Sequence, residues 1–203
     1  MFELSWQAPY DWPWMWGFLQ ARAVTGIERF EADSYARSFE FDGHCGVITM
    51  TPDESRQVLR VTLSEGLLPV AESCLTRVSR LLDLNCEPQI INDTLGALAR
   101  ARPGLRLPGS MDAFEQGVRA ILGQLVSVSM AAKLTGKVVA AFGEPLPEFP
   151  GFYLFPRPEH LMSAEPQQLK ALGMPRKRAE SLIYLAKAAS SGELPVNAPE
   201  DIE

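Results

Sequence analysis

The first 65 positions of the chain alternate between polar and apolar residues, and aromatic side chains are prominent among the apolar ones. A period of two is the pattern of strands that bury one face and expose the other. The dipeptide Asp42-Gly43 separates two of these segments and is a strong hairpin-turn signal. This part of the sequence therefore predicts an antiparallel sheet of consecutive strands. The predicted strands cover residues 27–30, 35–41, 46–50 and 58–63.

After Gly66 the spacing of apolar residues changes to three or four, which is the spacing of amphipathic helices. A further helix precedes the strands, because Pro13 suits a first helical position and Gly26 follows the apolar stretch. Residues 143–158 contain five prolines and predict a connector. The predicted helices cover residues 13–24, 70–82, 90–98, 112–122, 127–142, 158–163, 166–172 and 175–190.

The order of these elements predicts an α+β fold, in which an N-terminal antiparallel sheet with packed helices is followed by an all-α region. We place the boundary after Pro88, which gives an α+β domain at 1–88 and a helical domain at 89–203. Pro199 and the acidic residues after it have the pattern of a first helical turn. A single turn is not stable alone. This segment is therefore either a frayed tail or the start of a helix that continues, which would leave the helical domain incomplete.

Composition narrows the possible functions. The net charge of −6 and the pI of about 5.1 argue against a broadly basic, nucleic-acid-binding surface, so any such surface must be local. Three cysteines without metal-ligand spacing predict reduced thiols in a cytoplasmic protein, and only two histidines are present. The sequence has no signal peptide and no apolar run that could span a bilayer. It also has no zinc or dinucleotide motif, so we expect neither a metal nor an organic cofactor.

The segment from Asp112 to Ser127 is the most informative one for function. A helix ends at Gly123, Gln124 and Leu125 follow on a tight turn, and Ser127 can cap the next helix. An apolar side chain at such a tip can enter a nucleic-acid duplex and fill the space that a displaced base leaves. Leu125 also extends the apolar stripe of the preceding helix, so the same spacing is compatible with a core residue.

The first helix contains three tryptophans within five residues, followed by Phe18 and Arg22. Because these last two residues are four apart, they share a helix face. An aromatic face beside a cationic donor suits a flat, electron-poor ring, although packing of the aromatics on the sheet explains the pattern equally well.

Three successive cations, Arg176, Lys177 and Arg178, begin the last predicted helix. Cations are unfavourable next to the positive end of a helix dipole, so their position requires an explanation. Contact with phosphate groups would provide one, and a solvated face with long mobile side chains would provide another.

At these residues the sequence resembles the bacterial 3-methyladenine DNA glycosylase II family, within the helix-hairpin-helix glycosylase superfamily. The resemblance extends along the whole chain and is much more specific than any single short motif. Its most specific stretches are 9–12, 85–90, 101–109, 112–128 and 170–175.

The resemblance implies a DNA-repair enzyme without a cofactor that flips alkylated bases out of double-stranded DNA and hydrolyses the N-glycosidic bond. It implies that Leu125 is the wedge that replaces the flipped base, with Gln124 beside it. Phe18 and Arg22 then form the near wall of an aromatic base pocket. The family's hairpin and the catalytic aspartate after it have no counterpart in these 203 residues. We therefore assign no catalytic residue here and expect the chain alone to be an inactive, monomeric fragment.

Two other classes of function stay open at this point. The chain could be a noncatalytic module that recognises damaged DNA, in which case lesion-dependent binding needs no further residues. It could also be an interaction domain without a DNA role, which burial of both Leu125 and Phe18 would favour.

Overall fold

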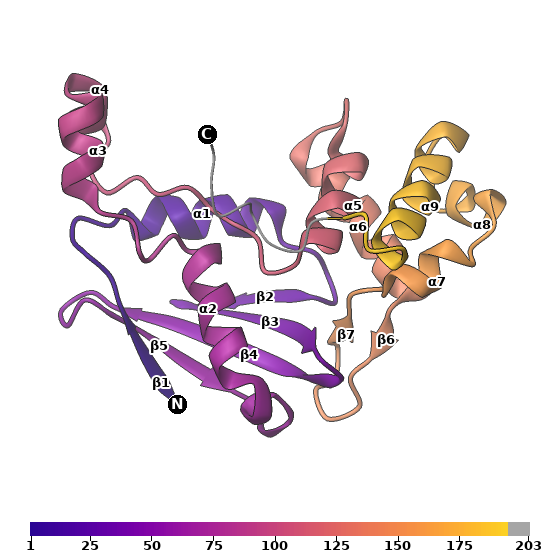
Figure 1. Cartoon of the computed structure of the whole chain (residues 1–203), viewed down its shortest axis with the longest axis horizontal. Helices are drawn as coiled ribbons and strands as arrows, with labels where there is room; N and C mark the ends of the chain where they lie inside the picture. Colours follow the sequence, from indigo (N-terminus) through magenta and orange to yellow (C-terminus); the bar gives the residue numbers. More distant parts are fainter. Residues whose placement is uncertain (195–203) are drawn as a thin grey trace. The chain divides into compact units, whose positions relative to one another are not determined.

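The structure, a computed structural model, describes residues 1–194, and their contacts divide the chain into two compact units. Unit 1 comprises residues 1–23 and 28–111, and unit 2 comprises residues 24–27 together with the chain from Asp112 onward. Figure 1 shows the five strands of unit 1 as one sheet. These strands are β1 (Phe2–Ser5), β2 (Glu28–Glu31), β3 (Ser34–Phe41), β4 (His44–Asp53) and β5 (Val58–Leu63).

The sheet of unit 1 is antiparallel throughout, in the order β1-β5-β4-β3-β2. Asp42 and Gly43 form the turn between β3 and β4 with positive φ angles of 50° and 75°, as their sequence predicted. The predicted α+β class is confirmed. The strand β1 was not predicted, and it pairs Phe2 with Val61 at the edge of the sheet.

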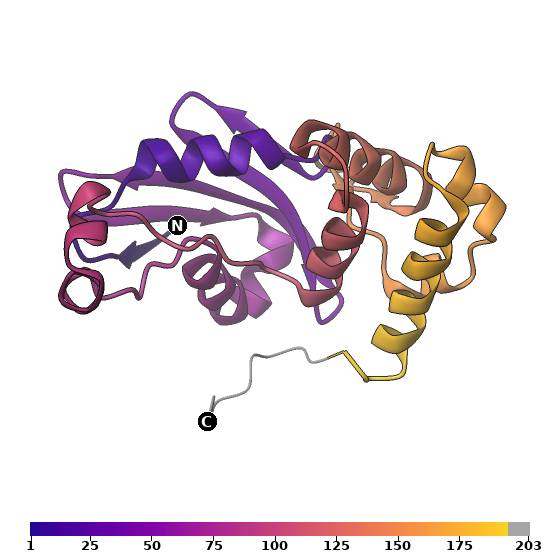
Figure 2. The ribbon, with the colours of Figure 1, turned by 90° about the horizontal axis from the view of Figure 1, so that it is seen from above.

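One face of the sheet packs on two helices to form the core of unit 1. The helix α1 (Trp12–Arg22) buries Trp12, Met15 and Leu19, which are three or four residues apart. Figure 2 shows α1 in indigo running along the sheet. The helix α2 (Ala71–Leu81) follows the 3₁₀ helix η1 (Glu65–Val70) and contributes Cys74, Val78 and Leu81 to the same core.

Residues 88–111 contain two short helices, α3 (Pro88–Leu95) and α4 (Ala97–Ala101), followed by an irregular segment. This stretch lies in compact unit 1, whereas the sequence placed it after the boundary at Pro88. The physical reason is Arg106, whose buried guanidinium donates hydrogen bonds to the backbone carbonyls of Gln7, Pro9 and Cys86. The domain boundary after Pro88 stays a prediction, because a compact unit is defined by contacts and not by independent folding.

The phenol of Tyr10 packs against the core of unit 1 and is expected to make the stability of this unit sensitive to alkaline pH. Its ring stacks on Trp12 at 3.9 Å between centroids, and its hydroxyl donates to the carbonyl of Leu82 at 2.5 Å. Burial raises the pKa of Tyr10 above its usual range, and the nearby Arg106 guanidinium offsets only part of this effect. The neutral phenol is thus favoured in the folded state.

Since the pKa of Tyr10 is raised on folding, its contribution is complete below the unfolded pKa of about 10 and is lost as the pH rises above it. We expect the urea midpoint of the chain to fall between pH 9 and 11, and to fall less in Tyr10→Phe. Tryptophan fluorescence provides the measurement. Identical pH profiles in the two proteins would contradict this assignment.

Unit 2 consists mainly of helices packed around a large apolar core, with a smaller apolar cluster beside it. Figure 2 shows its last helix, α9, in yellow. Side-chain caps stabilise the starts of its first two helices. The Asp112 carboxylate accepts a hydrogen bond from the Glu115 backbone N–H at 2.7 Å, and the Ser127 hydroxyl accepts one from the Met130 backbone N–H at 3.2 Å. The helices are α5 (Ala113–Gly123), α6 (Val128–Phe142), α7 (Pro158–Met162), α8 (Pro166–Ala171) and α9 (Arg176–Ser190).

The proline-rich segment 143–158, for which the sequence predicted a connector, also contains regular structure. It contains a small antiparallel ladder of β6 (Glu144–Pro145) and β7 (Tyr153–Leu154). The backbone N–H of Tyr153 also donates to the carbonyl of Gly26 at 2.7 Å. Val24 and Ile27 are fully buried there in a cluster with Val139. Unit 2 therefore takes part of its core from a segment near the start of the chain.

Candidate nucleic-acid interface

The turn between α5 and α6 projects one apolar side chain from unit 2. The helical path ends at Gly123, because Gln124 adopts an extended conformation with a ψ of 126°. Leu125 then takes a left-handed conformation with a φ of 57°. The cap at Ser127 starts α6 two residues later. We call residues 124–127 the wedge turn.

Leu125 is fully exposed, with a relative accessibility of 103%. The alternative that it belongs to the core is therefore wrong, although Phe114, Val118 and Leu122 of the same stripe are buried as predicted. A left-handed leucine costs about 1 kcal/mol, and its exposure forgoes about 2 kcal/mol of burial. Neither feature stabilises the fold. A strained leucine that contributes no burial points to a function for the side chain at the tip of the turn.

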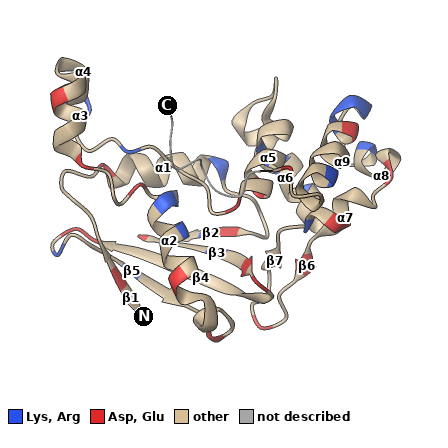
Figure 3. Cartoon of the chain, in the orientation of Figure 1, with Lys and Arg blue, Asp and Glu red and all other residues tan. Residues whose placement is uncertain are grey.

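The three cations at the start of α9 have different surroundings. Figure 3 shows their blue colour at this end of α9. Arg176 pairs with Glu180 at 2.7 Å, one helical turn further along. Arg178 donates from Nη2 to the backbone carbonyl of Gln124 at 2.6 Å, which links α9 to the wedge turn. Lys177 is exposed, and its amino group has no hydrogen-bond or ion-pair partner among residues 1–194.

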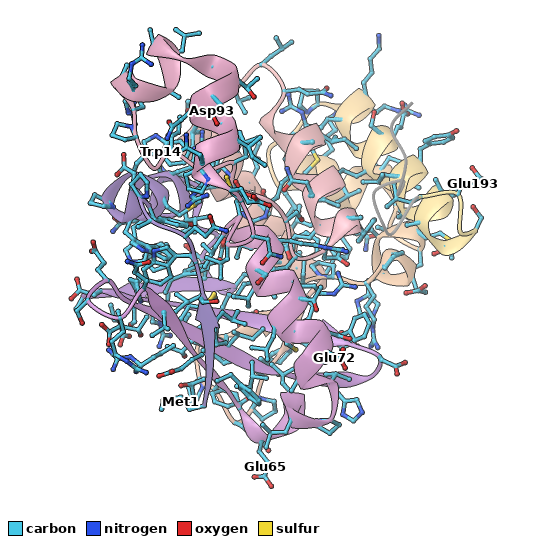
Figure 4. All side chains as sticks on the ribbon, turned by 60° about the vertical axis from the view of Figure 1, so that its left-hand side comes forward. Met1, Trp14, Glu65, Glu72, Asp93 and Glu193 are labelled. Carbon is cyan, nitrogen blue, oxygen red and sulfur yellow. The ribbon has the colours of Figure 1, made fainter. Side chains whose placement is uncertain are left out.

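Phe18 and Arg22 of α1 share a helix face, as their spacing predicted. The guanidinium carbon of Arg22 lies 3.6 Å from the centroid of the Phe18 ring, and its Nη1 donates to the Phe18 carbonyl at 3.1 Å. Phe18 is half-buried and Arg22 is exposed. Trp14, labelled in Figure 4, lies 5.4 Å from Phe18 between ring centroids and is tilted by 30°.

Packing on the core explains much of the aromatic pattern of this helix. Trp12 is buried at the sheet, and Trp16 contacts Phe30 and Tyr35 of the neighbouring strands. Phe18 packs against the same core and is half-buried, so only part of its side chain is accessible. Phe18 and Arg22 belong to unit 1, whereas Gln124 and Leu125 belong to unit 2.

Other site types find little support in the part of the chain that the structure describes. No group of three His, Cys, Asp or Glu side chains there could hold a metal ion. No carboxylate of residues 1–194 is hydrogen-bonded to the wedge turn, and none of the described helices is long and apolar enough to cross a membrane. The helix start predicted at 197–203 lies outside the described residues.

Two family models match the chain. The AlkA N-terminal domain matches residues 1–112, and the HhH-GPD superfamily of base excision DNA repair proteins matches residues 118–201. The chain is 59% identical over 203 residues to DNA-3-methyladenine glycosylase 2 of Escherichia coli. The aligned region covers all of this chain and 72% of that protein. The chain is 31% identical over 202 residues to a probable bifunctional transcriptional activator/DNA repair enzyme AlkA of Mycobacterium tuberculosis, covering 95% of the chain and 39% of that protein.

Solved structures agree with this relationship. The 3-methyladenine DNA-glycosylase of Archaeoglobus fulgidus superposes with a TM-score of 0.77 at 25% identity, over 92% of this chain and 66% of that one. A structure of MBOgg1 in complex with a low-affinity DNA ligand shares the fold at a TM-score of 0.64 and 20% identity, over 87% of this chain and 59% of that one. With the matched family models and the identity along its whole length, the chain belongs to the AlkA family of helix-hairpin-helix base excision DNA repair glycosylases.

Proposed function

We propose that this chain supplies the wedge and one wall of the base pocket to a glycosylase that removes alkylated bases of the 3-methyladenine type. In that reaction water adds to the anomeric carbon of the sugar while the base leaves. An alkylated base that carries a positive charge is already a good leaving group, so stacking can select it with few hydrogen bonds. The observation that carries the proposal is the exposed, left-handed Leu125.

Leu125 suits the space that a flipped base vacates in a duplex. An apolar side chain there replaces stacking contacts that the displaced base has lost, which stabilises the flipped state. Gln124 precedes it, and both residues are exposed. The polar amide of Gln124 can hydrogen-bond a base edge beside the wedge, because it presents both donors and acceptors.

Phe18 and Arg22 are proposed to form the near wall of the base pocket. In the present arrangement the Arg22 guanidinium covers the Phe18 ring at 3.6 Å. A base that stacks on this ring would take the position of the guanidinium. Arg22 is exposed, and in the base-bound state proposed here its guanidinium leaves the ring, so that its N–H groups can hydrogen-bond the base or a phosphate.

The partner in this proposal is double-stranded DNA that contains alkylated bases. The side chain of Lys177, next to Arg178 in the sequence, is exposed and suits contact with the DNA backbone, although the net charge of the chain is −6. We propose a cytoplasmic monomer that needs no cofactor, and a catalytic aspartate that follows Glu203 in the full-length protein. By full-length protein we mean this chain with any residues that its gene encodes after Glu203.

Leu125→Ala tests the wedge directly. We expect it to lower the single-turnover rate of base release by the full-length protein about tenfold, because roughly 1–2 kcal/mol of leucine burial in the duplex is lost. Affinity for a duplex with an abasic site is expected to fall by a similar factor. The measurement is release of 3-methyladenine from alkylated DNA under excess enzyme.

The control for this substitution is Leu68→Ala, which removes another exposed leucine, 48% accessible, from unit 1. Its rate should equal that of the unmodified protein. Thermal unfolding of Leu125→Ala should be unchanged, because the side chain makes no buried contacts. Unchanged base release in Leu125→Ala would eliminate the wedge assignment.

A further inference from the structure

The conformation of the wedge turn requires an explanation beyond its two flanking helices. The helix α5 has ended at Gly123, and the cap at Ser127 fixes only the start of α6. The backbone N–H of Gln124 makes a long hydrogen bond of 3.4 Å to the carbonyl of Ile121. Leu125 itself lies in the left-handed region, which leucine seldom adopts. Neither α5 nor α6 therefore determines the direction in which the Leu125 side chain points.

A third element contacts the turn directly. Arg178 donates to the carbonyl of Gln124, the peptide oxygen immediately before Leu125, at 2.6 Å. The distance is that of a strong charge-assisted hydrogen bond. Because this peptide group sets the φ angle of Leu125, a fixed carbonyl direction constrains where the leucine points.

Arg178 is well placed to act as a fixed support. Its neighbour Ala179 is fully buried, as is Leu182 one turn later, so α9 is anchored in the core of unit 2. Arg178 is half-buried, whereas Arg176 and Lys177 beside it are exposed. Among residues 1–194, the Gln124 carbonyl is the acceptor for the Arg178 guanidinium. The contact spans 54 positions of sequence, which suits a tertiary support and not a local turn.

We propose that Arg178 is a positioning residue that holds the wedge turn in the conformation in which Leu125 enters DNA. This inference rests on the proposed role of Leu125 as the wedge. It also explains why a cation occupies the first turn of α9, where the helix dipole disfavours it. The carbonyl dipole of Gln124 compensates for that position.

The test is a double-mutant cycle of Arg178→Ala and Leu125→Ala in the full-length protein, with lesion binding and base release as readouts. We expect Arg178→Ala alone to lower both about tenfold, as for a lost charged hydrogen bond. In the Leu125→Ala background it should have no further effect. A duplex with 2-aminopurine beside an abasic site reports wedge insertion, and its fluorescence increase on binding should shrink in Arg178→Ala.

Lys177→Ala is the matched control, because it removes the neighbouring cation without touching the Gln124 carbonyl. Loss of a phosphate contact weakens the binding of damaged and undamaged DNA equally, and it lowers the salt dependence of that binding. We expect that behaviour from Lys177→Ala and not from Arg178→Ala. Should Arg178→Ala fail to fold, Arg178→Lys enters the same cycle, with a smaller loss in the same direction.

The outcomes separate this inference from the wedge proposal on which it rests. No effect of Leu125→Ala would overturn the wedge proposal and the inference together. A clear effect of Leu125→Ala would leave the wedge intact. Three results would then contradict the role assigned to Arg178. Its replacement could leave lesion binding and base release unchanged, it could lower them additively with Leu125→Ala, or it could weaken the binding of undamaged DNA equally.

Discussion

The 203-residue chain is expected to release no free base from alkylated duplex DNA above the DNA-only background, whereas the full-length protein is expected to release it readily. Hydrolysis passes through a cationic sugar that a carboxylate must stabilise, and the loss of one such electrostatic group lowers the rate by a factor of about a hundred to a thousand. The function proposed above assigns this carboxylate to an aspartate that follows Glu203. Chromatography of bases released from methylated DNA measures the difference.

The comparison also distinguishes the two DNA-related functions. Fluorescence anisotropy with abasic and undamaged duplexes should give weak binding by the 203-residue chain, with little preference for the lesion. Nanomolar, lesion-dependent binding without base release would favour a noncatalytic recognition module. Substantial base release by the 203-residue chain would refute the assignment of the catalytic group to a later segment.

Replacement of Arg106 by alanine is expected to destabilise unit 1 by about 3–5 kcal/mol, because packing and hydrogen bonds to a charged donor are lost together. The guanidinium is 2% exposed and bonds three carbonyls from two distant segments, and it lies 5.1 Å from the Tyr10 ring centroid. Its removal leaves a cavity and three carbonyls with a lost donor. All four tryptophans lie within the first sixteen residues, so tryptophan fluorescence in urea reports on unit 1 alone.

Arg106→Met separates the two causes in this prediction, because methionine retains most of the volume but no donor. If the hydrogen bonds dominate, both variants lose comparable stability. Arg80→Ala serves as the control, since it removes an exposed arginine from the end of α2 in the same unit. A loss below about 1 kcal/mol in Arg106→Ala would show that the three carbonyls find other partners.

Much of the fold could be predicted because its periodic patterns are long. The aromatics of β3 and the turn at Asp42 specified a hairpin, and the capped stripes of α5 and α6 specified helices with bounds within a residue or two. The strand β1 was missed because four residues carry little periodicity, and its pairing with β5 spans the whole sheet-forming segment. The ladder of β6 and β7 was missed because Pro145 within it reads as a breaker.

The candidate site was less predictable for a physical reason. Helical spacing from Leu122 places Leu125 in the buried stripe, and only the extended ψ of Gln124 turns it outward. No residue pattern encodes the left-handed conformation of a leucine, which glycine would normally mark. The contact between Arg178 and Gln124 depends on how α9 packs, so the sequence offered only an unexplained cation. The pairing of Phe18 with Arg22, in contrast, is local to one helix and followed from spacing.

The segment with Val24 and Ile27 has a consequence for biosynthesis. Both side chains are fully buried in unit 2 beside Val139, and Gly26 bonds Tyr153. At translation rates of about 5–20 residues per second, Ile27 leaves the ribosome roughly 10 s before Tyr153 is made. During that interval the nascent chain carries two apolar side chains without their final neighbours, between α1 and β2, which have already emerged. A separately expressed piece beginning at Asp112 would lack them permanently.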